Sequence, residues 1–269
     1  MPELPEVETI RRDLEKILRG DAVCALEVGD RRLLSETEEA RWRRGVFGHA
    51  WTHFDRHGKY LSIALENGRR ILFHLRMSGQ LILNGAPPAP KARLRLNFVS
   101  GRTLAFCDQR RFGEVWLLEP GESWRSSKVL GPDALNELSR EAFVKIVRAR
   151  SARIQPILMD QRLMAGVGNI YAQEALFRAR LRPSRPGRRV KIAEAERLYD
   201  ALRQTLETAI ERRGSTSRNY RDAYGQAGAA QSLHAVYRKG GKPCPRCAQA
   251  LRAVRIGGRG SVYCPGCQT

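Results

Sequence analysis

Apolar residues near the start of the chain recur at the spacing of one helix face. They are Val7, Ile10, Leu14, Ile17 and Leu18, and Gly20 follows them as a stop signal. The pattern predicts an amphipathic helix whose start carries Glu3, Glu6 and Glu8. Carboxylates are favoured there because the N-terminal end of a helix dipole is positive. For Glu8 we expect this role alone.

From about residue 22 to residue 118 the period shortens to the alternation of β-strands. The first clear runs are Leu61, Ile63 and Leu65, then Ile71, Phe73 and Leu75. Asn67-Gly68 between the two runs favours a hairpin. Further runs span residues 81–83, 94–98, 103–107 and 115–118. This half predicts an antiparallel β-sandwich or barrel.

Helical spacing returns in the second half of the chain. The stretch from Pro120-Gly121 to Gly131-Pro132 is typical of a linker between domains. Beyond it, apolar periods predict helices around residues 143–147, 154–161, 172–179 and 198–210. Residues 214–230 are rich in Gly, Ser, Arg and Ala and predict a mobile loop.

The composition adds a strong positive charge to this picture. With 269 residues, the chain is long enough for two domains of ordinary size. Lys and Arg total 48 against 28 Asp and Glu, and 48 − 28 gives a net charge of +20, with Arg in excess. Such a charge attracts polyanions, and guanidinium groups suit phosphates, so nucleic-acid binding is favoured. A ribosome-associated protein or a coding bias towards Arg would give the same balance.

The sequence gives no sign of a membrane or secreted protein. No apolar stretch approaches the roughly 18 residues of a membrane span, and the N-terminus lacks a secretory pattern. We therefore expect a cytosolic protein with no membrane partner. Six cysteines suit that compartment if four bind a metal, which leaves Cys24 and Cys107 as free thiols.

The cysteines provide the most specific local signal. Cys244-x2-Cys247 and Cys264-x2-Cys267, separated by sixteen residues, match a four-cysteine zinc ribbon. Four thiolates fill every position of a tetrahedral ion, so one structural Zn²⁺ without a catalytic role is predicted. Between the pairs, residues 255–261 predict a glycine-flanked hairpin tip that presents Arg259 to a groove or phosphate, unless it is only a solvated turn.

Pro2 becomes a secondary amine at the N-terminus once Met1 is removed. An α-amino group titrates near about 7.7–8.0, so a useful fraction is unprotonated at neutral pH and can attack an electrophilic carbon. Glu3 and Glu6 would lie within a few residues of this nitrogen. Separately, the turn at 166–169 offers backbone N–H groups and Asn169 to an anion, although an ordinary helix–helix turn has the same pattern.

Taken together, these residues resemble the bacterial formamidopyrimidine-DNA glycosylases, a group that also includes endonuclease VIII. The resemblance runs nearly end to end. It depends on residues 2–9 (PELPEVET), 57–61 (HGKYL), 74–79 (HLRMSG), 108–113 (DQRRFG), the turn at 166–171 and the ribbon. Leu4 is similar to the formamidopyrimidine branch, because endonuclease VIII usually has Gly there.

The resemblance implies an α+β fold. It has an N-terminal antiparallel β-sandwich with an N-terminal helix, and a C-terminal helix-two-turn-helix domain with a four-cysteine zinc ribbon. The implied bounds are 1–120 for the catalytic domain, 121–135 for a linker, 136–240 for the helical DNA-binding domain with a lesion-capping loop, and 241–269 for the ribbon. The implied partner is double-stranded DNA containing damaged bases, bound by a monomer.

The resemblance also implies a base-excision mechanism. In this family Pro2 attacks deoxyribose C1′, expels the base and leaves an iminium, from which β- and then δ-elimination cut the strand. The implied catalytic residues are Pro2, Glu3 and Lys59: Glu3 would be the general acid or base, and Lys59 would contact the phosphate beside the lesion. Glu6 would support them by holding the terminus.

Further phosphate ligands implied by the resemblance are His74, Asn169 and Arg259. Without it, Lys59 would be interpreted as a surface charge on a strand and His74 as a half-buried strand residue.

A base inside a duplex must be extruded before this chemistry, and the gap must be filled. Met77, Arg110 and Phe112 match the family's inserting residues: Phe112 wedges a base step, Met77 occupies the vacated stack, and Arg110 bonds the orphaned base. Core packing is the alternative for Met77 and Phe112, but the Arg-rich turn before Gly113 favours exposure of Phe112.

The sequence departs from the family pattern at several positions. Gln155 stands where Lys is usual, Gln109 where Pro is common, and Arg76 where Gly is usual; residues 228–231 lack the aromatic expected in the loop over the extruded base. Oxidised purines such as 8-oxoguanine and formamidopyrimidines are the favoured substrates, with oxidised pyrimidines as the alternative. Outside this class, a non-catalytic zinc protein that binds damaged DNA, or an RNA-associated zinc-ribbon protein, would explain the charge.

Overall fold

The computed structural model describes residues 1–85, 91–122, 129–216 and 218–269. They form two compact units: residues 1–128 with 212–231, and residues 129–211 with 232–269. The predicted linker lies partly outside the described residues, at 123–128. The first unit includes residues 212–231, which come after the last long helix of the second unit in the sequence. The domain bounds expected from the sequence stay a prediction.

Two four-stranded antiparallel sheets form the body of the first unit, in the orders β1-β6-β7-β5 and β2-β3-β4-β8. The strands are β1 Val23–Val28, β2 Trp51–His57, β3 Tyr60–Leu65, β4 Arg70–His74, β5 Gly79–Leu83, β6 Ala92–Phe98, β7 Thr103–Asp108 and β8 Glu114–Leu118. The predicted sandwich is confirmed, and so is the hairpin at Asn67-Gly68, which joins β3 to β4.

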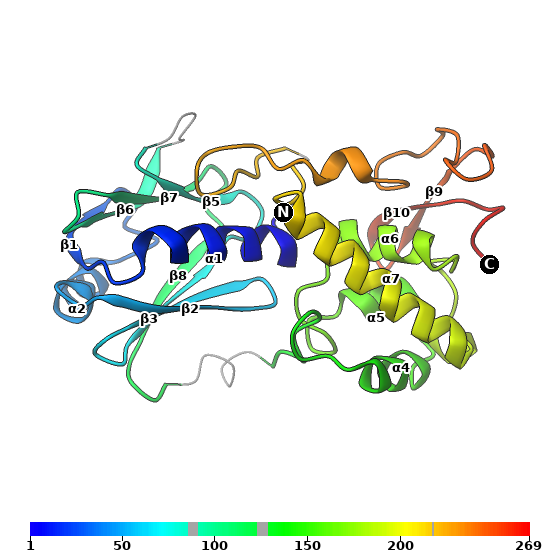
Figure 1. Ribbon diagram of the computed structural model, residues 1–269, viewed down its shortest axis with the longest axis horizontal. Coiled ribbons are helices and arrows are strands. Elements are labelled where there is room, and N and C mark those ends of the chain that lie inside the picture. Colours follow the sequence, from blue (N-terminus) through cyan, green and yellow to red (C-terminus); the bar gives the residue numbers. More distant parts are fainter. Residues whose placement is uncertain (86–90, 123–128, 217) are drawn as a thin grey trace. The chain divides into compact units, whose positions relative to one another are not determined.

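Helix α1, Leu4–Leu18, lies between the strands of the two sheets (Figure 1). Its apolar face enters a core built from both sheets, through the fully buried Ile10, Leu14 and Leu18. The predicted amphipathic helix is therefore confirmed, and the apolar residues that recur along it are the ones that contact the core. Packing of α1 into this core fixes the direction in which its N-terminus points within the unit.

Helix α2, Glu36–Val46, was not predicted from the sequence. It buries Trp42 and Val46 completely, but charged residues dominate its sequence, so the apolar period is weak. A signal for its start was present: the hydroxyl of Ser35 accepts a hydrogen bond from the Glu38 N–H, and Ser-x-x-Glu is a capping pattern.

The described residues of the segment 212–231 include no long helix and no strand, as the composition predicts. Tyr220 and Ala223 are nevertheless buried in the same core as α1. The amide of Leu83 at the end of β5 donates to the carbonyl of Ala223 at 2.8 Å, and Gln80 donates to the carbonyl of Asn219. The segment is therefore anchored to the sandwich by packing and by backbone hydrogen bonds.

The second unit is helical and ends in a β-hairpin. Its elements are α4 Arg140–Arg148, α5 Ile154–Met159, α6 Asn169–Arg178, η1 Gly187–Arg189, α7 Ile192–Glu211, β9 Arg252–Ile256 and β10 Arg259–Tyr263, and η2 spans Ala230–Leu233. The four predicted helices are present, although α5 ends at Met159, two residues before the expected limit. Among the described residues, none of the helices is long and apolar enough to cross a bilayer.

Candidate active site and zinc centre

The N-terminal turn of α1 holds the candidate nucleophile. Pro2 is buried, and Glu3 is the N-cap residue with only 2% of its surface exposed. Glu3 and Glu6 form a capping box: the Glu3 N–H donates to Glu6 Oε2 at 2.7 Å, and the Glu3 side chain accepts from the backbone of Glu6. The residue next to the candidate nucleophile is thus fixed through both its backbone and its carboxylate.

Glu6 joins this turn to the segment 212–231. Its second oxygen, Oε1, accepts a hydrogen bond from the Ser215 N–H at 2.7 Å, and Glu6 itself is 1% exposed. Gly214 has a φ of +78°, and a Cβ there would lie 2.9 Å from Glu6 Cγ and 3.0 Å from Oε1. Glycine is therefore favoured at position 214 for two reasons: it adopts the positive φ of the turn, and it has no Cβ to collide with Glu6.

Lys59 lies in the turn between β2 and β3, and His74 is the last residue of β4. Strand register pairs Tyr60 with His74, and their rings lie 4.3 Å apart between centroids. Lys59 and His74 therefore come from neighbouring strand ends. Both are buried, at 8% and 7% exposure, so the alternatives of an exposed strand cation and a half-buried histidine are wrong.

The turn that carries Lys59 is connected to α1 by an ion pair. Arg56 Nη1 donates to the Gly58 carbonyl at 3.1 Å, and Arg56 Nε donates to Glu8 Oε2 at 3.1 Å. Glu8 also accepts from Arg11 and Arg12. The expectation that Glu8 only complements the helix dipole is wrong, because this carboxylate binds three guanidinium groups.

The three predicted inserting residues lie together on the surface. Met77 is 46% exposed and Phe112 52% exposed, so core packing is excluded and the expected exposure of Phe112 is confirmed. The Arg110 guanidinium lies 4.9 Å from the Phe112 ring centroid, and its Nη1 lies 3.3 Å from Met77 Sδ. These contacts bring two loops, one before β5 and one after β7, into a single exposed cluster.

Asp108 fixes both of these loops, a role that sequence reasoning missed. Its Oδ1 accepts from the Ser78 hydroxyl at 2.5 Å and the Arg110 N–H at 3.2 Å, while Oδ2 accepts from the Gly113 N–H at 2.6 Å. A turn-forming Asp before two arginines was the available signal. Arg76, beside Met77, pairs with Glu114 and adopts a φ of +52°, a backbone conformation that favours glycine.

In the second unit, Asn169 is the first residue of α6, as the Gly-x-Gly turn predicts. Gln155 Nε2 donates to Asn169 Oδ1 at 2.9 Å, and Asn169 Nδ2 donates to the Gly260 carbonyl at 3.0 Å. Gln155, where a lysine was expected, therefore orients Asn169 by a neutral hydrogen bond. Its Oε1 is buried without a hydrogen-bond partner among the described residues.

The hairpin of β9 and β10 places Arg259 beside this helix start. Gly257 and Gly258 have φ values of +55° and +77° and form the predicted tip. Gln173 Nε2 also donates to the Gly260 carbonyl, at 3.2 Å, so the hairpin is tied to α6. A shallow pocket at this place is lined by Pro156, Met159, Asp160, Ile256, Gly257 and Arg259.

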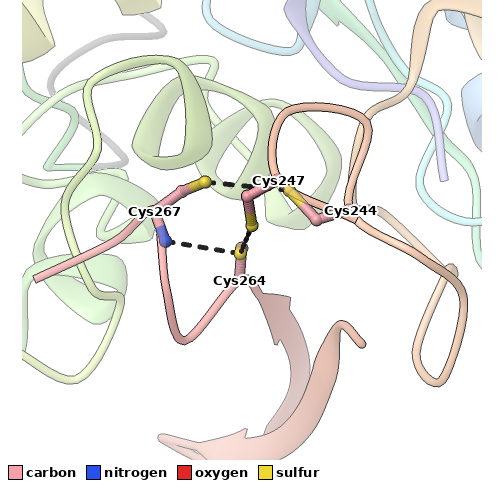
Figure 2. Close-up of side chains that lie close together, drawn as sticks. All are labelled: Cys244, Cys247, Cys264 and Cys267. Carbon is pink, nitrogen blue, oxygen red and sulfur yellow. Dashed lines mark hydrogen bonds between the residues drawn. The ribbon is translucent and has the colours of Figure 1, made fainter. Parts of the chain in front are cut away.

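The four ribbon cysteines converge as a metal site (Figure 2). All four sulfur atoms lie within 4.8 Å of one another, with Cys244 and Cys267 3.8 Å apart and Cys247 and Cys264 3.4 Å apart. Tetrahedral Zn–S bonds of about 2.3 Å separate sulfurs by about 3.8 Å, so the donor set fits Zn²⁺. Four sulfur ligands leave no position for water, and the zinc is structural.

Comparisons with known proteins agree with this geometry along the whole chain. Family models match residues 1–115 (formamidopyrimidine-DNA glycosylase N-terminal domain), 130–221 (formamidopyrimidine-DNA glycosylase H2TH domain) and 241–269 (zinc finger found in FPG and IleRS). The chain is 42% identical to the formamidopyrimidine-DNA glycosylase of Pelotomaculum thermopropionicum over 273 residues, which cover 100% of this chain and 99% of the relative.

Solved structures give the same result. MutM (Fpg) of Thermus thermophilus superposes with a TM-score of 0.87 at 40% identity, covering 99% of this chain and 98% of the other. Lactococcus lactis Fpg, in a complex with DNA containing an abasic site, superposes with a TM-score of 0.90 at 32% identity, covering 99% of each chain.

Proposed function

This chain belongs to the formamidopyrimidine-DNA glycosylase family, and we propose that it excises oxidised purines from double-stranded DNA and then cuts the strand, with Pro2 as nucleophile. The buried N-terminal turn carries the proposal, because Pro2 precedes a glutamate whose backbone and carboxylate are both held. Solved relatives that bind Fapy-dG and carbocyclic 8-oxo-G DNA support the substrate class.

Covalent catalysis would begin at the Pro2 nitrogen, after removal of Met1. Its lone pair forms a bond to deoxyribose C1′ while the glycosidic C1′–N bond breaks, and the base leaves with that electron pair and takes up a proton. The C1′–O4′ bond then breaks, O4′ leaves with the electron pair and takes up the proton lost by the Pro2 nitrogen, and an iminium forms between Pro2 and C1′. The iminium acidifies the C2′–H bond, so loss of this proton expels the 3′ phosphate, and a further elimination expels the 5′ phosphate.

Glu3 is the candidate for proton transfer at the sugar, because it is the carboxylate nearest in sequence to Pro2. Glu6 acts through position: it holds the Glu3 amide on one oxygen and Ser215 on the other. A fixed terminus raises the fraction of time in which the nitrogen faces C1′, and orientation of this kind accounts for several kcal/mol of a barrier.

DNA would be bound through phosphates by residues of both units. Lys59 and His74 offer contacts from neighbouring strand ends of the sandwich, and Asn169 and Arg259 offer them from the helix start and the ribbon tip. The helix start supports anion binding because the N-terminal end of the helix dipole is positive. In the ribbon, the four cysteines would hold Zn²⁺, which would neutralise their thiolate charge and stabilise the hairpin that carries Arg259.

The exposed cluster of Met77, Arg110 and Phe112 would replace the extruded base. Exposed apolar side chains of this size suit insertion into a base stack, and the guanidinium beside them can donate hydrogen bonds to the orphaned base. We further propose that the protein acts as a monomer on the DNA of the bacterial cytosol.

A panel of duplexes tests the substrate and the reaction together. Purified protein is incubated with duplexes carrying 8-oxoguanine, a formamidopyrimidine, an oxidised pyrimidine or an abasic site, with and without borohydride. We expect covalent adducts with the purine lesions and the abasic site, and slower adduct formation by a Pro2→Gly protein, whose N-terminal primary amine replaces the imino nitrogen. Faster cleavage of the pyrimidine lesion would replace the purine assignment, and tight binding without adduct or cleavage would favour a non-catalytic protein.

A further inference from the structure

Arg213 stands at the start of the segment 212–231 in a backbone conformation that is unfavourable for it. Its φ is +58°, in the left-handed region that is unfavourable for a residue other than glycine. Its side chain must therefore make contacts that offset this cost.

Two buried carboxylates provide those contacts. Arg213 Nη2 lies 2.6 Å from Asp13 Oδ2 and 2.7 Å from Asp222 Oδ2, and Arg213 Nε donates to the same Asp222 oxygen at 2.8 Å. Asp13 and Asp222 are 6% and 1% exposed. Together they raise the pKa of Arg213 against the effect of burial, which lowers it, so this guanidinium stays charged.

Each carboxylate holds a different element. Asp13 belongs to α1, whereas Asp222 belongs to the segment and accepts from the Tyr224 and Gln226 N–H groups at 3.0 and 2.9 Å. Arg213 therefore fastens the segment to the helix. We call Arg213, Asp13 and Asp222 the arginine clamp.

The clamp lies next to the contacts that fix the active-site turn. Gly214 and Ser215 follow Arg213 directly, and Ser215 N–H reaches Glu6 Oε1 at 2.7 Å. Glu6 and Asp13 are seven residues apart on α1, two helical turns along one face. The segment thus contacts this face at both Asp13 and Glu6, and only Gly214 separates the clamp from the Ser215 amide.

We propose that Arg213 is a positioning residue for the reaction: through the arginine clamp it sets the Ser215 amide on Glu6, and Glu6 in turn holds the turn that carries Pro2. The inference rests on the proposed function, because it assigns Arg213 an effect on the Pro2 nitrogen. Arg213 touches neither Pro2 nor DNA in this account and acts only through Glu6.

The test is the rate of covalent trapping in single turnovers with saturating abasic-site duplex and borohydride, measured across pH with the full-length zinc-loaded protein. Arg213→Gly removes the cation, and glycine adopts the positive φ easily. Arg213→Lys keeps a positive charge but lacks the planar guanidinium that can bind two carboxylates at once. Arg212→Ala is the matched control. It removes the same positive charge from the neighbouring position, where the side chain is exposed.

For Arg213→Gly we expect a trapping rate constant lowered roughly tenfold to a hundredfold, as for a small misplacement of a reacting group. Its pH–rate profile should shift, while the final trapped fraction and the DNA dissociation constant stay close to those of the wild type. Arg213→Lys should recover part of the rate, and Arg212→Ala should match the wild type.

A merely structural clamp gives a different result. In that case the variants lose thermal stability and trapped fraction, but the molecules that do react keep the wild-type rate constant and pH profile, and the inference is wrong. If Arg213→Gly does not fold, Arg213→Lys decides by the same criteria. If the wild-type protein itself forms no adduct, the proposed function is wrong. If the wild type forms adducts and the Arg213 variants do so at the same rate, only the role of Arg213 is wrong.

Discussion

Arg56 Nε donates a hydrogen bond to Glu8 Oε2 at 3.1 Å and so joins strand β2 to helix α1 inside the protein. The Arg56 and Glu8 side chains are 1% and 8% exposed. Because Arg56 also donates to the Gly58 carbonyl, the pair holds the turn that carries Lys59. A buried charge pair of this kind links folding stability to the geometry of a candidate phosphate ligand.

Glu8→Gln should reduce stability in a pH-dependent way. Burial raises the pKa of Glu8, but hydrogen bonds and charges from Arg11, Arg12 and Arg56 outweigh it, and the pKa is lowered below its ordinary 4.5. A lowered pKa stabilises the fold above about pH 4.5, and this contribution is lost as the pH falls through the folded-state pKa. Breaking a buried pair costs about 3 kcal/mol, so we expect a loss of that order at pH 7.

Denaturant unfolding from pH 7 to pH 3 measures this effect. The difference between wild type and Glu8→Gln should be largest at pH 7 and shrink in acid. Glu66→Gln is the control, because Glu66 is 52% exposed and should change the free energy of unfolding by no more than about 0.5 kcal/mol. A difference that is independent of pH would show that the charge of Glu8 contributes nothing.

Removing the exposed inserting side chains should separate folding from base extrusion. Met77→Ala and Phe112→Ala truncate exposed side chains, so the free energy of unfolding should change by less than about 0.5 kcal/mol. Excision from a duplex requires a few kcal/mol of unstacking, so its rate should fall roughly tenfold to a hundredfold. Trapping on an abasic site, which has no base to extrude, should fall less. Equal losses on both substrates would contradict the inserting role.

Gln155 and Arg259 should affect DNA binding in different ways. Arg259→Ala removes a cation from the phosphate site, so the slope of the logarithm of affinity against the logarithm of salt should decrease by about one. Gln155→Ala removes a neutral side chain that donates to Asn169, and should weaken binding by about 1 kcal/mol without changing that slope. Titrations of labelled duplex at several salt concentrations compare the two. A changed slope for Gln155→Ala would show that it does more than orient Asn169.

Loss of zinc should unfold the ribbon selectively. Four clustered thiolates repel one another without a cation, and the buried apolar side chains around them, Val236, Leu251 and Val262, depend on the closed site. Chelation, or Cys264→Ser, should abolish tight DNA binding while the sandwich keeps its near-ultraviolet circular dichroism. Unchanged DNA affinity after verified metal loss would contradict a role for the ribbon in binding.

The sequence predicts local features of this protein well because each has a local cause. The apolar spacing of α1, the Asn67-Gly68 hairpin and the paired cysteines are visible within a few residues. Helix α2 was missed because its apolar period is weak, and the contacts of Glu6 with Ser215 and of Asp13 with Arg213 join positions about two hundred residues apart, which no spacing rule reaches. Glu8 was misjudged only partly for this reason: Arg56 comes from a distant strand, but Arg11 and Arg12 lie three and four residues away on the same helix, where the spacing already predicts ion pairs.

The central claim is that the Pro2 nitrogen forms the bond to the sugar. Borohydride-reduced adducts on abasic-site DNA, digested with nuclease and protease, locate the attached sugar by tandem mass spectrometry. The account predicts the sugar remnant on the peptide that begins with Pro2, at its N-terminal nitrogen, with Met1 absent. A remnant on a lysine such as Lys59, with an unmodified Pro2 peptide, would contradict it.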